Sequence, residues 1–202
     1  MVQDGSLEVL KILSNASAII AEGEVHQLLT TNDVATSEDT YLDIIKAKTA
    51  ALFSAACRIG AIVTERGSQY EEALEGYGKN LGIVFQLIDD ALDYGSNSGN
   101  FGKLIGDDFR EGKITLPVIL AYRRGNTEER KFWERTLQLS DQKESDLDFA
   151  ISLMRKHNSL NDTIKRALHY GAKAKDALAI FPKNKTKNIL LDLVDFCIDR
   201  TH

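Results

Sequence analysis

Residues 82–94 read GIVFQLIDDALDY, and this stretch decides the fold class. Its apolar residues recur at spacings of three and four, which is the period of an α-helix. Asp89, Asp90 and Asp93 close the segment, and residues four apart lie on one face of a helix. Acidic side chains are unfavourable at the C-terminal end of a helix, because the helix dipole presents partial negative charge there. The pattern therefore indicates that something compensates these carboxylates.

A hard divalent cation is one candidate for that compensation. Magnesium takes oxygen ligands, and substrate phosphates commonly complete its coordination shell. A solvated acidic face with no ligand is an equally good reading of an isolated DDxxD pattern. Zinc is a poor candidate, because Cys57 and Cys197 have neither CxxC spacing nor a suitably spaced histidine.

The same helical period extends over most of the chain. Only two prolines occur in 202 residues, and no run of alternating β-branched residues predicts a sheet. We therefore expect one all-helical domain over residues 1–202. The expected helices span residues 6–29, 38–65, 69–94, 115–123, 127–139, 144–157, 160–181 and 183–200, with a short turn at 107–112.

Composition excludes several classes of function. The net charge is -5, from 25 basic and 30 acidic residues, and no basic block could follow a nucleic-acid backbone. No stretch approaches the roughly 18 to 20 apolar residues of a membrane span, and the first residues do not read as a secretory signal. We expect a cytoplasmic protein with no nucleic-acid partner and no stable membrane insertion.

Three lysines could meet an anion. The expected helix 38–65 carries an apolar stripe formed by Tyr41, Ile44, Ile45, Leu52, Ala56 and Ile59. Lys48 falls on this stripe, where an ammonium group must reach water or bind an anion, and Thr49 follows it directly. Lys103 and Lys113 flank a glycine-rich stretch, in which glycines allow the backbone to approach a ligand. A lysine that extends to water and an ordinary connecting loop are the alternatives.

Four stretches, taken in order, resemble the C-terminal motifs of trans-type polyprenyl diphosphate synthases. They are AEGEVHQL at 21–28, YLDIIKAKTAALF at 41–53, GIVFQLIDDALDY at 82–94 and GKLIGDDFREGKITLPVI at 102–119. Each alone is weak, but their common order and spacing make the combination specific. The GE and KTA segments look most like the long-chain enzymes of the family.

The resemblance implies the isoprenoid synthase fold, an antiparallel helix bundle around a central cavity. It implies a magnesium-dependent prenyltransferase of isoprenoid biosynthesis that adds isopentenyl diphosphate to an allylic diphosphate. Such an enzyme must neutralise the leaving diphosphate and exclude water from the cation. Carried over by position, Asp89, Asp90 and Asp93 hold Mg²⁺; Lys48, Lys103 and Lys113 bind the allylic diphosphate; oxygens of Thr49 and Gln86 face the developing cation; and Phe85 borders isopentenyl diphosphate.

The family's first aspartate-rich motif belongs upstream of the segments found here. The expectation is therefore a C-terminal portion that lacks the N-terminal helices, is inactive alone and forms a homodimer or oligomer through exposed apolar faces. A non-catalytic partner subunit of a heteromeric synthase is the second hypothesis. A terpene cyclase is a third, although the Asn/Asp, Ser/Thr and Glu triad typical of cyclases is not found in the sequence.

Overall fold

The computed structural model describes residues 5–95 and 105–200, and within these ranges every regular element is a helix. The all-helical prediction is confirmed, and the expected helices agree with the observed ones to within a few residues at most ends. The elements are α1 (Leu7–Thr30), α2 (Glu38–Ile45), η2 (Lys46–Ala50), α3 (Ala51–Val63), α4 (Ser68–Leu92), α5 (Asp107–Arg110), α6 (Leu116–Arg124), α7 (Thr127–Trp133), η4 (Glu134–Gln138), α8 (Asp146–Lys156), α9 (Ser159–Ala177), η5 (Leu178–Ile180) and α10 (Lys185–Asp199).

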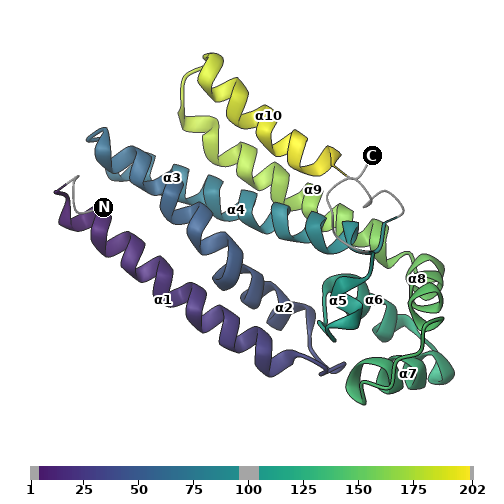
Figure 1. The fold of residues 1–202 in the computed structure, drawn as a ribbon. Coiled ribbons are helices and arrows are strands. Elements are labelled where there is room, and N and C mark those ends of the chain that lie inside the picture. The colour runs from purple at the N-terminus through teal and green to yellow at the C-terminus, as the bar shows by residue number, and fades with distance from the viewer. Residues whose placement is uncertain (1–4, 96–104, 201–202) are drawn as a thin grey trace.

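The long helices lie side by side in the order α1, α3, α4, α9, α10, as Figure 1 shows. Helix α4 contacts α3 on one side and α9 on the other, and residues along most of its length are buried. The short helices α5 to α8 gather near the end of α4 that carries the aspartates (Figure 1). None of the described helices is both long enough and apolar enough to cross a membrane.

Helix α1 packs through small side chains rather than through its leucines. Ser6 caps its first turn by accepting a hydrogen bond from the amide of Val9. The buried positions are Val9, Ala16 and Gly23, which are seven residues apart and so share one face. Six of its larger apolar residues, by contrast, are exposed: Leu7, Leu10, Ile19, Val25, Leu28 and Leu29.

The expected helix 38–65 is one continuous helical stretch that contains a π-helical segment, η2. One extra residue in a turn rotates everything after it by about 100°. Tyr41 and Ile45, which precede η2, are buried as the predicted apolar stripe requires. Leu52 follows η2 and is exposed, so the stripe does not continue beyond the π-helical segment. Ala50 and Phe53 face α4 instead, close to Gly82 and Gly78.

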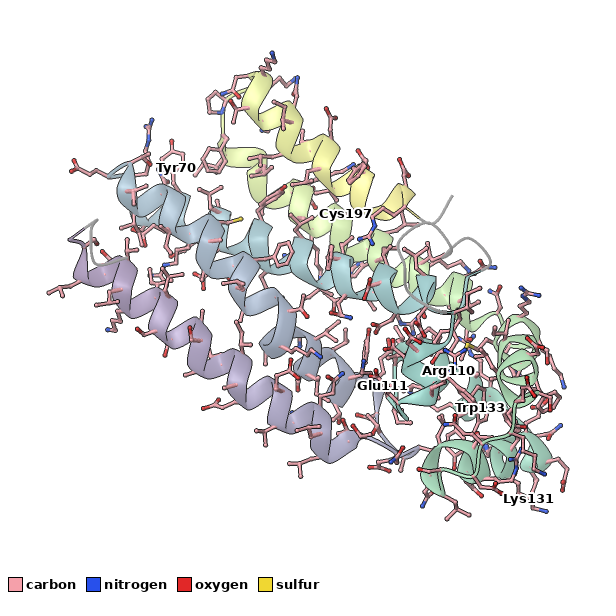
Figure 2. All side chains as sticks on the ribbon, in the orientation of Figure 1. Tyr70, Arg110, Glu111, Lys131, Trp133 and Cys197 are labelled. Atoms are coloured by element: carbon pink, nitrogen blue, oxygen red, sulfur yellow. The ribbon has the colours of Figure 1, made fainter. Side chains whose placement is uncertain are left out.

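The second half of the core surrounds Trp133, which is completely buried among the short helices (Figure 2). Helix α7 begins with a capping box, in which Asn126 accepts from the amide of Glu129 and the Glu129 carboxylate accepts from the amide of Asn126. The expected helix 127–139 ends in a second π-helical segment, η4. This group of short helices supports the segment that leads into α6.

Candidate active site

A cleft opens where α1, α2, η2 and α4 meet the segment before α6. The empty space between its lining residues is roughly 370 Å³, a figure that includes open solvent. Four of the predicted site residues line it: Lys48, Gln86, Asp90 and Lys113. The full lining is Gln27, Thr30, Thr31, Tyr41, Ile44, Ile45, Lys48, Gln86, Asp90, Lys113, Ile114 and Thr115.

A chain of hydrogen bonds joins η2 to α4 at this cleft. The Thr49 hydroxyl donates to Oε1 of Gln86 at 2.8 Å, and Nε2 of Gln86 donates to Oδ1 of Asp90 at 2.7 Å. From α2, the Tyr41 hydroxyl donates to Oδ2 of Asp90 at 2.5 Å. The Asp90 carboxylate accepts a hydrogen bond from the amide nitrogen of Gln86, so the amide oxygen of Gln86 must point the other way, toward Thr49. The oxygens of Thr49 and Gln86, both assigned to the developing cation, thus lie next to each other in the structure.

Lys48 reaches across to α1. Its Nζ donates to Oε1 of Gln27 at 2.5 Å and lies 3.4 Å from a carboxylate oxygen of Glu24. The close approach of the two helices depends on Gly23, because a Cβ there would lie 2.7 Å from the backbone nitrogen of Lys48. The lysine is therefore held at its backbone and at its ammonium group by the same helix.

Lys113 follows a tight turn built on Gly112. Gly112 adopts a φ of +70°, which favours glycine, and its carbonyl accepts from the amide of Asn32 at 2.9 Å. The Lys113 ammonium contacts Asp108 at 3.1 Å and Glu111 at 2.7 Å. Burial lowers the pKa of Lys113, but these acidic partners outweigh it and hold the pKa above its usual value. Lys103 lies outside the described residues.

The three aspartates of α4 occupy different environments. Asp90 is 3% exposed, and burial, followed by the Asp108 carboxylate, raises its pKa to about 7 despite hydrogen bonds from Tyr41 and Gln86. Burial and Asp108 likewise raise the pKa of Asp93 to about 6, although the amide of Asp108 donates to Oδ2 of Asp93 at 3.1 Å. Asp89 is half-buried on the same helix. The acidic crowding expected from the sequence is present.

Within residues 5–95 and 105–200, no three acidic, histidine or cysteine side chains converge as a ready metal site. The donor chemistry nevertheless fits Mg²⁺, which is commonly bound through one or two carboxylates and completed by phosphate. Asp89 in the last turn of α4 and Asp93 at its C-cap lie four residues apart and can supply such a pair. Asp90 differs, because both its oxygens already accept hydrogen bonds inside the protein.

Phe85 lies one turn before Asp89, outside the lining of the cleft. Its ring packs against Phe53 of α3, with centroids 5.7 Å apart. The guanidinium of Arg200, at the end of α10, lies 5.2 Å from the ring centroid on its face. The structure therefore places this residue between the neighbouring helices, and its predicted contact with substrate is untested.

The sequence reasoning missed two residues of the cleft. Tyr41 was assigned only to an apolar stripe, although a tyrosine seven residues from Lys48 lies on the same face of a helix. No role was predicted for Gln27, which lies in the segment 21–28. Its spacing of four residues from Gly23 could have indicated that both residues lie on the face of α1 that contacts η2.

Comparison with known proteins places these features in one family. The family model described as polyprenyl synthetase matches residues 1–154. Octaprenyl diphosphate synthase of Haemophilus influenzae is 40% identical over 197 residues, which cover 98% of this chain and 60% of that protein. Octaprenyl diphosphate synthase of Escherichia coli is 36% identical over 200 residues, which cover 99% of this chain and 62% of that protein.

Solved structures agree. A decaprenyl diphosphate synthase from Rhodobacter capsulatus superposes with a TM-score of 0.94 at 46% identity, over all of this chain and 62% of the other. A polyprenyl synthase from Caulobacter crescentus CB15, complexed with calcium and isoprenyl diphosphate, superposes with a TM-score of 0.96 at 46% identity. The superposition again covers all of this chain and 62% of the other. The chain thus spans about 60% of the length of these relatives. With its isoprenoid synthase fold and a family match over three quarters of its length, the chain belongs to the polyprenyl synthetase family.

Proposed function

We propose that this chain, as one helical domain, carries the allylic diphosphate site of a cytoplasmic trans-polyprenyl diphosphate synthase. The proposed reaction is transfer of an allylic group to isopentenyl diphosphate, and relatives named octaprenyl diphosphate synthase support it. The observation that carries the proposal is the cleft in which two lysines, Lys48 and Lys113, face the Gln86–Asp90 pair. A related structure that holds isoprenyl diphosphate supports this assignment.

In this proposal the lysines hold the departing diphosphate, with Lys103 as a third cation. Ammonium groups bind phosphate oxygens through charge-assisted hydrogen bonds, which are stronger than neutral ones. The oxygens of Thr49 and Gln86, fixed in direction by Asp90, face positive charge that develops on the allylic carbon. Oriented dipoles stabilise such charge without attacking it. Phe85 borders the second substrate.

Asp89 and Asp93 would hold Mg²⁺ together with oxygens of the diphosphate, and Asp90 would support them from inside the helix bundle. When bound, the metal neutralises charge on the leaving group. The chain's own part is to present these carboxylates at the end of α4. Burial is the main cause of the raised pKa values of Asp90 and Asp93, and the neighbouring Asp108 carboxylate adds to it; a bound cation would offset this second contribution.

Calorimetry of the whole chain with magnesium pyrophosphate tests the site. We expect binding that weakens at least tenfold in Asp89→Asn and in Lys113→Gln. Lys131→Gln is the matched control, because Lys131 is exposed at the outer edge of α7 (Figure 2). Equal affinity in all four proteins would refute the site. In a synthase assay with both diphosphates and magnesium, we expect no elongation by the isolated chain.

The exposed face of α1 supports a second candidate, a partner subunit of a heteromeric synthase. Val25, Leu28 and Leu29 are all more than half exposed there, and apolar patches of this kind mark protein interfaces. In either role we propose that the chain self-associates or pairs through this face. Copurification with a longer synthase would favour the partner role, whereas sedimentation as a monomer at micromolar concentration would contradict self-association.

A further inference from the structure

We propose that Gln27 is a positioning residue that aims the Lys48 ammonium group while leaving its positive charge available to an anion. This inference rests on the proposed function, in which Lys48 binds a diphosphate. The inference is based on the nearest partner of the Lys48 ammonium group, which is a neutral amide oxygen: Oε1 of Gln27 lies 2.5 Å from Nζ. The nearest carboxylate, that of Glu24, lies farther away at 3.4 Å and is 51% exposed.

The position of Gln27 is fixed by backbone packing. Gly23 lies four residues earlier on the same face of α1 and lets that helix approach the backbone of Lys48. Thr30, which also lines the cleft, continues this face by one more turn. Gln27 thus stands between the contact of α1 with η2 and the open part of the cleft, so its side chain meets the ammonium at a defined place.

The second lysine of the cleft shows the contrast. Lys113 contacts two carboxylates, those of Asp108 and Glu111, at 3.1 and 2.7 Å. Its charge is compensated before any ligand arrives, whereas Lys48 has one half-exposed carboxylate at a longer distance. A glutamate at position 27 would occupy the same space but pair with Lys48 as a charged partner, and would also repel a diphosphate.

The test is calorimetry of the whole chain with magnesium pyrophosphate. In Gln27→Glu we expect affinity to fall on the order of tenfold, because a negative charge enters beside the binding cation. In Gln27→Met, which keeps the length but not the acceptor, we expect a loss of roughly twofold to threefold from a less ordered ammonium group. Glu24→Gln should bind as tightly as the parent chain or more tightly.

Ionic strength separates an electrostatic role from a structural one. The loss in Gln27→Glu should shrink as salt rises from 0.05 to 0.5 M, because screening weakens charge interactions. Gln69→Glu is the matched control, since it introduces the same charge on the exposed first turn of α4, roughly 30 Å along the helix from Asp89. It should leave affinity unchanged.

Lys48→Met distinguishes the two proposals. If Lys48→Met weakens binding but Gln27→Glu stays within twofold of the parent chain, the inference about Gln27 is wrong and the proposed function stands. If Lys48→Met binds normally, the role of Lys48 in the proposed function is wrong, and the inference falls with it. If the loss of pyrophosphate affinity in Gln27→Glu did not change with salt concentration, the inference would also be overturned, because that result indicates misfolding.

Discussion

The hydroxyl of Tyr41 in α2 donates a 2.5 Å hydrogen bond to Oδ2 of Asp90 in α4, and both residues are at most 3% exposed. The bond ties the second helical stretch to the centre of the bundle at the floor of the cleft. A buried carboxylate that loses a donor keeps the full cost of its desolvation. The pair should therefore matter to stability as well as to the direction of Gln86.

Above pH 7, where Asp90 with its pKa of about 7 is ionised, Tyr41→Phe should lower the free energy of unfolding by about 1.5–3 kcal/mol, as expected for a hydrogen bond to a charged group. Urea denaturation followed by circular dichroism measures it. Tyr122→Phe, which removes a half-buried hydroxyl bonded to Glu134 at 3.1 Å, should cost less. If Tyr41→Phe cost as much in an Asp90→Asn background as in the parent chain, the two residues would not be coupled.

Gly23→Ala should destabilise the chain, although alanine favours helices. Its Cβ would lie 2.7 Å from the backbone nitrogen of Lys48, so α1 must move away from η2. Gly76→Ala in α4 is the control, because its Cβ would meet a neighbour at an ordinary 3.7 Å. That substitution should stabilise by roughly 0.5–1 kcal/mol from helix propensity. Thermal denaturation that moved both variants in the same direction would contradict this packing.

Gly112→Ala should disturb the turn before Lys113. The φ of +70° is costly for alanine by about 1–2 kcal/mol, and the new Cβ would overlap the side chain of Asn32. Gly67→Ala is the control, since no atom lies near its Cβ position and its φ is −66°. We expect a lower urea midpoint and weaker pyrophosphate binding only in the first variant.

Glu129 should stabilise the fold at neutral pH and lose this effect in acid. Hydrogen bonds from Lys156 and then from the amide of Asn126 lower its pKa to about 2. The folded-state pKa is below that of the unfolded chain, so the contribution is complete above about pH 4.5 and disappears as pH falls toward 2.

The difference in unfolding free energy between the parent chain and Glu129→Gln should therefore shrink from pH 6 to pH 3. Glu128→Gln serves as the control, because Glu128 is 81% exposed beside Lys131. A difference that stayed constant with pH would show that the Glu129 charge is not what the capping box uses.

Periodicity predicted the helices well, because their apolar positions recur at helical spacing. The structure adds the local caps at which two of them begin, Ser6 and Asn126. The two π-helical segments could not be predicted, since their extra residues are accepted only through contacts with distant helices. The burial of α1 was also not predicted: a face of small residues gives little hydrophobic signal beside exposed leucines.

Of the candidate site, the sequence predicted residue types and the resemblance predicted roles. In the structure Lys48, Gln86, Asp90 and Lys113 line one cleft, while the roles assigned to them stay predictions. It could not be predicted that Asp90 turns inward to Tyr41, because that direction depends on how α2 crosses α4. The contact of Gln27 with Lys48 likewise joins residues 21 positions apart.

The segment η2 has a consequence for the alignment of hydrogen bonds along its helix. Tyr41 and Thr49 are eight residues apart, which in a regular α-helix puts them about 80° out of phase. With one residue absorbed by the wider turn, the pair behaves as if seven apart and is only about 20° out of phase. Both hydroxyls therefore donate to side chains of α4, that of Tyr41 to Asp90 and that of Thr49 to Gln86. If the same residues formed a regular α-helix without the wider turn, the two hydroxyls would point about 80° apart and meet different neighbours.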